Sequence, residues 1–167
     1  MIFMGVDPSL RGCGVTIIDH NKKVLLFDVF GYTLSDKTEH ERIKRNLIIS
    51  QDVVKMGKKM DVDVIAVEGL GIAPKKNRLG NQIYLAEFIG ILKSQIYLSL
   101  RKIPMIVPPP SWKKAVIGSG KADKAEIKKC LEKRNYKFKV QDQYDALGVA
   151  LFALQNKQHI IDGRILC

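Results

Sequence analysis

Two aspartates, Asp142 and Asp145, stand at the start of a run from Ala146 to Leu154 that is apolar nearly throughout. If this run is helical, the i,i+3 spacing places both carboxylates on one face of the helix, about one turn apart. Val149 and Phe152 continue that face, so the sequence predicts that the two acids point toward packed protein. Buried like charges are unfavourable unless a cation neutralises them, and a hard divalent metal bound through oxygen suits carboxylates.

A simpler interpretation of this pair is that Asp142 caps the helix and Asp145 lies near the positive end of the helix dipole. Two further acids favour the metal site, because Asp7 and Glu68 each follow a short apolar run that is typical of a strand. If those strands are adjacent and parallel, both acids emerge at the carboxyl edge of one sheet, where open α/β folds bind ligands. Four carboxylates there could hold two metal ions about 3.5–4 Å apart, an arrangement that hydrolyses phosphodiesters.

Hydrophobic periodicity and turn residues predict the elements that must position these acids. The predicted strands are 2–6, 15–18, 24–30, 62–67 and 103–107, and the predicted helices are 36–60, 81–100, 111–116, 123–134 and 142–154. Tight connections make the first three strands an antiparallel meander, and a helix then returns the fourth strand parallel to the first. Pro8 lacks an amide proton, which places Asp7 at or just past the end of its strand. Ser111 and Asp123 are the expected N-caps of their helices.

This pattern predicts an α/β fold with a mixed five-stranded sheet flanked by helices, and residues 1–167 as a single domain. The helix 81–100 is apolar on more than one face, so it must be buried on more than one side. In a small domain with one sheet the second side predicts a subunit interface, and hence a homodimer formed through this helix.

The net charge of +11, from 28 basic and 17 acidic side chains, predicts a polyanionic partner. The basic residues are spread over several loops instead of forming one amphipathic helix, which favours nucleic acid over a membrane surface. Three widely spaced cysteines argue for a reducing compartment and against a disulfide framework or a structural zinc site. We find neither a secretory signal nor about 18 uninterrupted apolar residues, and expect an intracellular protein without a membrane partner.

Two basic segments are candidates for contact with phosphates. The loop that carries Lys75, Lys76 and Arg78 follows Glu68 directly, although a solvated surface loop would have the same composition. The second segment runs from Lys113 to Lys124, and its glycine-rich part resembles a phosphate-binding loop in composition only, since the P-loop spacing is absent. We expect Lys113, Lys114, Lys121 and Lys124 to bind DNA.

Four stretches together resemble the RuvC family of Holliday junction resolvases. They are Gly5-Val6-Asp7-Pro8-Ser9, Ile65-Ala66-Val67-Glu68, the segment from Trp112 to Lys124, and Asp142-Gln143-Tyr144-Asp145-Ala146-Leu147-Gly148-Val149-Ala150. The resemblance spans Ile2 to about Leu154. It implies a ribonuclease H-like fold, a homodimer, and Mg²⁺-dependent nicking of two strands of a four-way DNA junction, with Mn²⁺ able to substitute and two ions in each active site.

Carried over residue by residue, the resemblance makes Asp7, Glu68, Asp142 and Asp145 the metal-binding catalytic acids. Lys113 and Lys124 match the basic residues that the family places near the scissile phosphate, and we count them as catalytic.

The sequence also departs from typical bacterial members of the family. The loop after Asp7 is about two residues shorter and has Ser9 in place of a glycine, and only Leu70 or Ile72 could take the place of the aromatic residue that enters the junction. The compactness resembles a phage-encoded member, which would act in the cytoplasm of a bacterial host. The sequence does not indicate whether a branch-migration helicase is a partner.

Three other functions are compatible with parts of this pattern. A less selective fork or flap nuclease would use the same acids. A junction-binding protein without catalysis would be built similarly, but DNA binding alone favours removing negative charge from a pocket that faces phosphates. An ATP-binding domain of the actin and sugar-kinase type also opens with a strand, an acid and a hairpin, but needs two such domains around the nucleotide.

Overall fold

The computed structural model describes residues 1–71 and 79–157. The strands are β1 (Ile2–Pro8), β2 (Cys13–Asp19), β3 (Val24–Phe30), β4 (Val64–Glu68) and β5 (Met105–Val107). The helices are α1 (Glu39–Lys59), α2 (Leu79–Leu100), α3 (Pro109–Trp112), the π-helical turn η2 (Lys113–Ile117), α4 (Lys124–Glu132) and α5 (Gln141–Gln155). The order of elements agrees with the sequence prediction, and most boundaries shift by a few residues.

The five strands form one mixed sheet in the order β3-β2-β1-β4-β5. β1 pairs antiparallel with β2 and parallel with β4, so β1 lies at the centre of the sheet. β2 pairs antiparallel with β3, and β4 pairs parallel with β5. The predicted meander and the predicted parallel crossover are both confirmed.

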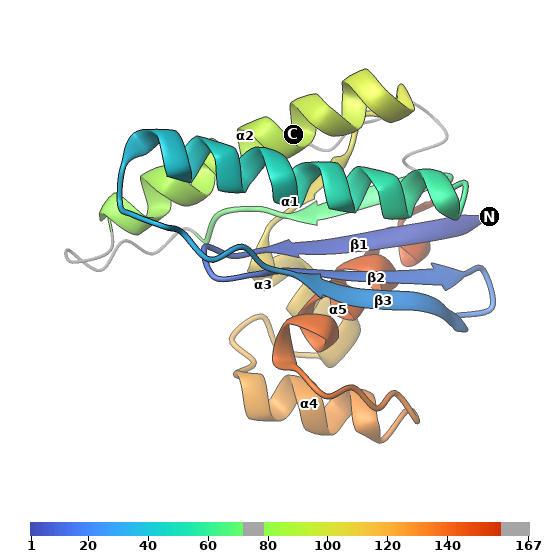
Figure 1. The fold of residues 1–167 in the computed structure, drawn as a ribbon. Coiled ribbons are helices and arrows are strands. Elements are labelled where there is room, and N and C mark those ends of the chain that lie inside the picture. The colour runs from blue at the N-terminus through green and yellow to red at the C-terminus, as the bar shows by residue number, and fades with distance from the viewer. Residues whose placement is uncertain (72–78, 158–167) are drawn as a thin grey trace.

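Helices cover both faces of the sheet, with α1 and α2 on one face and α4 and α5 on the other (Figure 1). Side chains of β1 alternate between these two faces. Met4 and Val6 point to one face, where they pack with α1 and α2 in one hydrophobic cluster. Phe3 points to the opposite face, where it belongs to the cluster that contains α5, Trp112 and α4. Asp7 has the same parity as Phe3, and therefore lies on the face that α5 covers.

The predicted end of the first strand needs a correction. β1 runs through Asp7 to Pro8, and Pro8 pairs with Cys13 of β2. The parallel ladder with β4 stops earlier, at Val6, so beyond this residue β1 is paired on one side only. Pro8 can therefore end β1 without breaking a hydrogen bond to β4, because the ladder between these two strands has already stopped.

Of the two predicted helix caps, one is wrong and one is confirmed, and the alternative interpretation of Asp142 as a cap is also excluded. Pro108, not Ser111, is the N-cap of α3, because the proline-rich turn starts the helix two residues earlier. Val140 precedes α5, so Asp142 is not a cap and lies inside the first turn. Asp123 caps α4 as predicted and forms a capping box with Glu126.

Helix α2 has one packed side and one open side. Phe88, Leu92 and Ile96 are buried against the sheet and α1, whereas Ile83 and Leu98 are 57% and 59% exposed. Its segment Gly80–Leu100 is long and apolar enough to cross a membrane by length and composition alone, and 22% of that window is buried in this protein. The structure thus leaves an apolar face of α2 open, as the sequence predicted.

Candidate active site

Asp7 and Glu68 meet at the carboxyl ends of the two central parallel strands. Val6 of β1 is in register with Val67 of β4, so the next residues of the two strands, Asp7 and Glu68, lie beside each other. Asp7 is buried, and Glu68 is half-buried as the last residue of β4. The sheet therefore brings together two acids that β2, β3 and α1 separate in the sequence.

Helix α5 reaches the same place because glycines on β1 and β2 let it approach the sheet backbone. A Cβ atom at Gly5 would overlap the Ala146 carbonyl oxygen and lie 2.5 Å from the Ala150 nitrogen. A Cβ atom at Gly14 would overlap the Asp142 carbonyl group. Thr16 of β2 donates a hydrogen bond of 3.1 Å to the Gln143 carbonyl and fixes the first turn of α5. Only residues without a side chain at positions 5 and 14 permit this contact.

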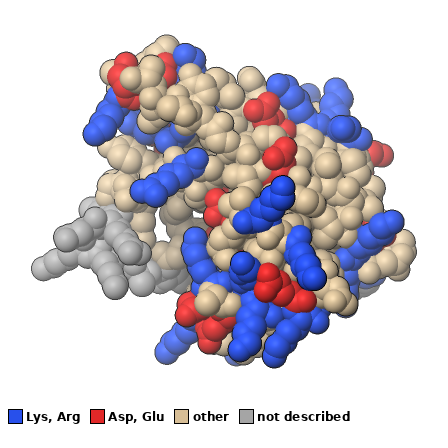
Figure 2. Space-filling view, turned by 60° about the horizontal axis from the view of Figure 1, so that its bottom comes forward, with Lys and Arg blue, Asp and Glu red and all other residues tan. Residues whose placement is uncertain are grey.

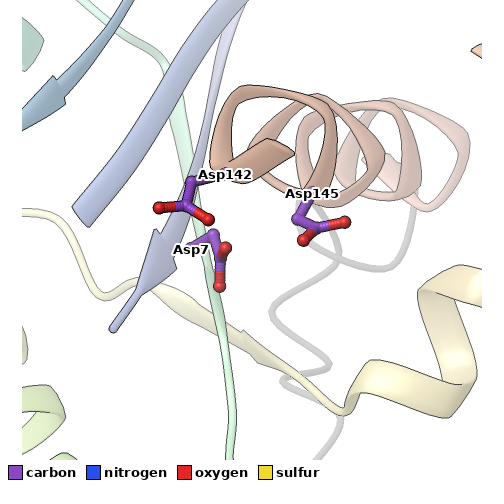
Figure 3. Close-up of side chains that lie close together, drawn as sticks. All are labelled: Asp7, Asp142 and Asp145. Carbon is purple, nitrogen blue, oxygen red and sulfur yellow. The ribbon is translucent and has the colours of Figure 1, made fainter. Parts of the chain in front are cut away.

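Three carboxylates converge as a result. One oxygen from each of Asp7, Asp142 and Asp145 lies within 4.8 Å of the others, and the three side chains lie close together where β1 meets the start of α5 (Figure 3). The sequence predicted that Asp142 and Asp145 share one face of a helix, and the structure places them so. Hard oxygen donors in this arrangement suit a divalent cation such as Mg²⁺.

The electrostatics of this cluster favour a cation. Burial raises the pKa of the Asp7 carboxyl well above its usual value, and the neighbouring Glu68, Asp145 and Asp142 raise it further. Burial also raises the pKa of Asp145, from 3.8 to about 6, and Glu68 adds to the rise, while a hydrogen bond from Gln141 opposes it. When several carboxylates lie this close together, ionising all of them costs free energy, and a bound metal ion offsets that cost.

Glu68 belongs to the site but lies outside the group of three. Its Oε1 atom accepts a hydrogen bond of 2.7 Å from the indole nitrogen of Trp112, which orients the carboxylate. Trp112 is fully buried, and its ring fills the space beside Gly148 of α5, where a Cβ atom would overlap it. Trp112 thus connects the end of β4 to α5, the helix that carries Asp142 and Asp145.

The acids line a cavity of about 510 Å³. Its lining consists of the four acids together with Ser9, Arg11, Pro109, Lys113, Lys124 and Ile127. Lys113 donates a hydrogen bond of 3.1 Å to the Ala122 carbonyl, which holds its side chain across the glycine-rich turn. Lys113 and Lys124 both lower the pKa of Asp145, so their charges act on the cluster.

Of the other predicted DNA-binding residues, Lys114 and Lys121 are exposed and do not line this cavity. The predicted contacts of Lys75, Lys76 and Arg78 lie outside the described residues. Figure 2 shows that Lys and Arg side chains are spread over the face that carries α4, with acidic side chains among them. This distribution agrees with the predicted broad basic surface.

Sequence reasoning missed Arg11, Trp112 as the partner of Glu68, and the glycines at positions 5 and 14. The spacing contained a signal for Gly5, because Gly5 and Asp7 are two residues apart on a strand and must share a face. A helix that delivers acids to Asp7 has to cross Gly5. No comparable signal marked Trp112, because its partner is distant in the sequence.

Comparison with known proteins agrees with this geometry. Residues 3–153 match the family described as Crossover junction endodeoxyribonuclease RuvC. RuvC of Paenarthrobacter aurescens is 30% identical over 156 residues, which cover 89% of this chain and 78% of that protein. RuvC of Helicobacter pylori is 30% identical over 156 residues, which cover 90% of this chain and 94% of that protein.

Solved structures share the fold at lower identity. The Thermus thermophilus RuvC structure has a TM-score of 0.75 at 18% identity and covers 98% of both chains. T. thermophilus RuvC in complex with Holliday junction substrate has a TM-score of 0.72 at 19% identity and covers 98% of this chain and 95% of that one. These likenesses confirm the ribonuclease H-like fold that the sequence predicted. Taken with the matches in sequence, they show that this chain belongs to the RuvC family of crossover junction endodeoxyribonucleases.

Proposed function

We propose that this protein resolves four-way DNA junctions by hydrolysing one phosphodiester bond in each of two strands. The observation that carries the proposal is the convergence of Asp7, Asp142 and Asp145 within 4.8 Å in a protein of net charge +11. A protein that only coats DNA gains nothing from buried negative charge at a surface that meets phosphates. Membership of a metal-dependent nuclease family supports the same function, as does the relative solved with a Holliday junction.

The donor set fits Mg²⁺, with Mn²⁺ able to substitute, and we propose two ions in each site. Bound there, the ions would lower the pKa of the attacking water and stabilise charge on the leaving oxygen. Asp7, Asp142 and Asp145 would hold them, and Glu68, oriented by Trp112, would complete the ligand set. Lys113 and Lys124 would hold the scissile phosphate at the rim, where their charges offset the repulsion between the acids and the DNA.

We propose that residues 1–167 act as one nuclease domain and that two copies pair through α2. One sheet covered on both faces supports the single domain. The open apolar face of α2, with Ile83, Tyr97 and Leu98 at least half exposed, supports the homodimer. Glu87 on the same helix accepts a hydrogen bond from Arg42 of α1. A helix that carries this charged pair is unfavourable inside a bilayer, so we propose that the open face meets a second copy of the protein and not lipid.

A junction nuclease must act where DNA is present, and we propose the bacterial cytoplasm as its location, without a membrane partner. The matching relatives named above come from cellular bacteria, so a phage origin stays a prediction from compactness. Leu70, one candidate for entering the junction, is 38% exposed, while the alternative, Ile72, lies outside the described residues.

The function is tested by incubating the protein with a labelled four-way junction, a fork, a flap and a linear duplex, each with and without Mg²⁺. We expect paired nicks in the junction only, and only with Mg²⁺. Equal cutting of forks and flaps would identify the less selective nuclease instead. Tight junction binding without any cutting would identify the non-catalytic binder.

Replacing Lys124 by alanine is expected to slow single-turnover nicking by about 10- to 100-fold while changing junction affinity by no more than about threefold. The lysine lines the cavity of the acids, so its charge acts where the phosphate reacts, and the broad basic surface supplies most of the affinity. Lys128→Ala removes the same charge from the exposed side of α4 and serves as the control. An unchanged rate for Lys124→Ala would contradict the role given to this residue.

Divalent metal is expected to stabilise the protein at neutral pH and to have little effect in acid. The pKa of Asp145 is raised from 3.8 to about 6, so between these values the folded state binds more protons than the unfolded state. The stability of the metal-free protein therefore falls as the pH rises through this window. Above it, the ionised cluster is ready to bind metal.

Saturating Mg²⁺ should raise the melting temperature by about 5–10 °C at about pH 7.5, and by no more than about 1 °C at about pH 4.5. Asp145→Asn should lose the response at neutral pH, and Asp52→Asn on the surface of α1 should keep it. A metal response of equal size at both pH values would exclude the cluster as its origin.

A further inference from the structure

The loop Ser9–Gly12, which joins β1 to β2, brings Arg11 to the cavity of the acids. Arg11 lines this cavity with Lys113 and Lys124, but it comes from a separate part of the chain. Its side chain is exposed, and within the residues that the structure describes it forms no salt bridge. Its guanidinium group is therefore available to a phosphate, which it can bind with two parallel hydrogen bonds.

The loop is tightened by its own hydrogen bonds. The Ser9 hydroxyl donates to the Gly12 carbonyl at 2.6 Å and accepts from the amides of Gly12 at 3.2 Å and Arg11 at 3.4 Å. The Ser9 amide also donates to the Gly12 carbonyl, at 3.1 Å. These bonds fix the shape of the loop, but they do not fix its position relative to the rest of the protein.

Arg45 of α1 supplies that second restraint. Its Nη1 atom donates a hydrogen bond of 3.2 Å to the Leu10 carbonyl, and its Nε and Nη2 atoms donate to Asn46 Oδ1 at 3.1 and 2.8 Å. Packing does not replace this contact, because a cavity of about 250 Å³, lined by Leu10, Arg45 and Tyr84 among others, lies beside the loop. The bond from Arg45 thus joins the loop to α1.

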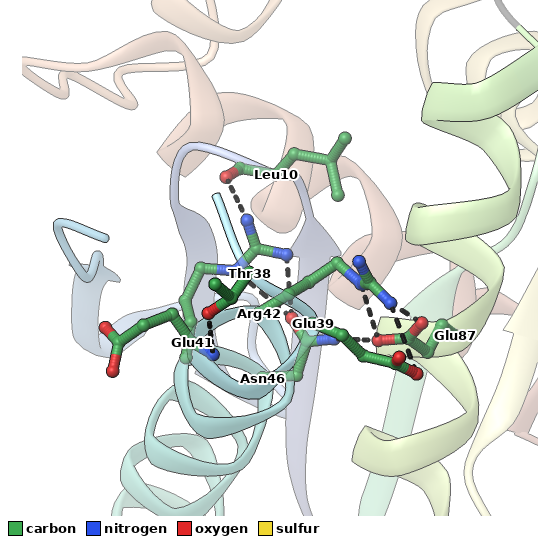
Figure 4. Close-up of polar contacts among 8 residues, drawn as sticks. Leu10, Thr38, Glu39, Glu41, Arg42, Asn46 and Glu87 are labelled. Carbon is green, nitrogen blue, oxygen red and sulfur yellow. Dashed lines mark hydrogen bonds and ion pairs between the residues drawn. The ribbon is translucent and has the colours of Figure 1, made fainter. Parts of the chain in front are cut away.

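The network continues from Arg45 to helix α2. Asn46 is fully buried and donates through Nδ2 to Glu87 at 3.0 Å, and Glu87 also accepts from Arg42 Nε at 3.2 Å (Figure 4).

Arg45 is only 6% exposed, and among the described residues it bonds a carbonyl and an amide but no carboxylate. A buried guanidinium without a paired acid is costly. What arginine adds here over an apolar side chain is its hydrogen bonds, two to Asn46 and one to the loop, and the bond to Leu10 is the one that reaches the active-site side.

We propose that Arg11 contacts the phosphate backbone of the DNA at the active site, and that Arg45 is a positioning residue that holds the loop Ser9–Gly12 so that Arg11 can do so. Asn46 and Glu87 anchor Arg45 from behind. The proposal rests on the proposed nuclease function and adds to it a third cation at the cavity. It also connects that cation to α2 through side chains that never touch the DNA.

The test is a double-mutant cycle with Arg11→Ala and Arg45→Met, measured as single-turnover nicking of a four-way junction at saturating protein. Arg11→Ala should slow nicking by about 10- to 100-fold, as expected for loss of a charged hydrogen bond to phosphate. Arg45→Met should cause a loss of similar size. If Arg45 acts through Arg11, the double variant should be slower than Arg11→Ala by no more than about twofold.

Melting temperature and junction affinity without metal are measured on the same samples, so that a folding defect is recognised. Ser9→Ala loosens the loop without disturbing α1, and its loss of rate should likewise vanish in the Arg11→Ala background. Lys44→Met removes one charge from the exposed side of the same turn of α1 and should nick at the normal rate.

Losses that multiply in the double variant would overturn the role of Arg45, and a normal rate for Arg11→Ala would overturn both roles. If Arg45→Met does not fold, Arg45→Gln, which keeps a polar side chain beside Asn46, takes its place in the same cycle with Arg11→Ala. A wild-type protein that does not nick would refute the proposed function itself, so the two failures can be told apart.

Discussion

Replacing Asp7 by asparagine is expected to abolish nicking while junction binding stays intact or becomes tighter. The rate should fall about a thousandfold or more, which corresponds to about 4 kcal/mol in activation free energy. Asp7 lies at the centre of the acid cluster, next to Glu68 and within 4.8 Å of Asp142 and Asp145. The amide removes one negative charge from the place where the phosphate must sit, so repulsion of the DNA decreases.

The same substitution should stabilise the metal-free protein at neutral pH. Burial and three neighbouring acids raise the pKa of Asp7, so its ionised form lowers the free energy of unfolding above that pKa. Nicking, gel-shift affinity and melting temperature measured together give the pattern: no activity, retained binding and a higher melting temperature. Asp52→Asn, the same change at a partly exposed site on α1 whose partner Lys55 is itself exposed, should leave all three unchanged. Full nicking by Asp7→Asn would refute the catalytic assignment.

Replacing Gly5 by alanine is expected to destabilise the protein by at least about 3 kcal/mol and to lower its melting temperature by about 6–12 °C. The added methyl group would overlap the Ala146 carbonyl and lie 2.5 Å from the Ala150 nitrogen. These are backbone atoms of α5, which cannot rotate away as a flexible side chain would. The helix must shift, and Asp142 and Asp145 shift with it. Protein that remains folded should therefore also lose activity.

Gly71→Ala is the matched control for this prediction. Gly71 lies in the exposed segment after β4, in neither α2 nor α5, and a Cβ atom there would meet nothing within 4 Å. This variant should therefore stay within about 0.5 kcal/mol of the wild type. Thermal unfolding of both variants provides the comparison. Equal melting temperatures for Gly5→Ala and the wild type would mean that α5 does not rest on the backbone of β1.

The acid pattern could be predicted because each part of it is a local signal. An acid at the end of an apolar run predicts the edge of a sheet, and the three-residue spacing of Asp142 and Asp145 predicts a shared helical face. These two rules, with the parallel crossover, were enough to bring Asp7 and Asp145 together. They carry no information about the depth of burial, which decides the raised pKa of both groups.

Two features could not be predicted, one for a local reason and one for a tertiary reason. Ser111 looks like a helix cap in the sequence, but the proline run starts the helix at Pro109 and leaves Ser111 inside it. Arg45 looks like one more surface cation of an amphipathic helix, yet it is buried and contacts Leu10, far away in the sequence. Both outcomes were decided by neighbours that periodicity does not register.

The hydrogen bond between Trp112 and Glu68 also gives this protein an internal optical probe. Trp112 is the single tryptophan of the chain, so all of its indole emission arises at the carboxyl edge of β4. An indole whose N–H group bonds a carboxylate is sensitive to any change in the charge on that carboxylate. Intrinsic fluorescence can therefore follow the arrival of an ion or a phosphate at the catalytic carboxylates in real time, without a label and without a substitution near the reacting groups.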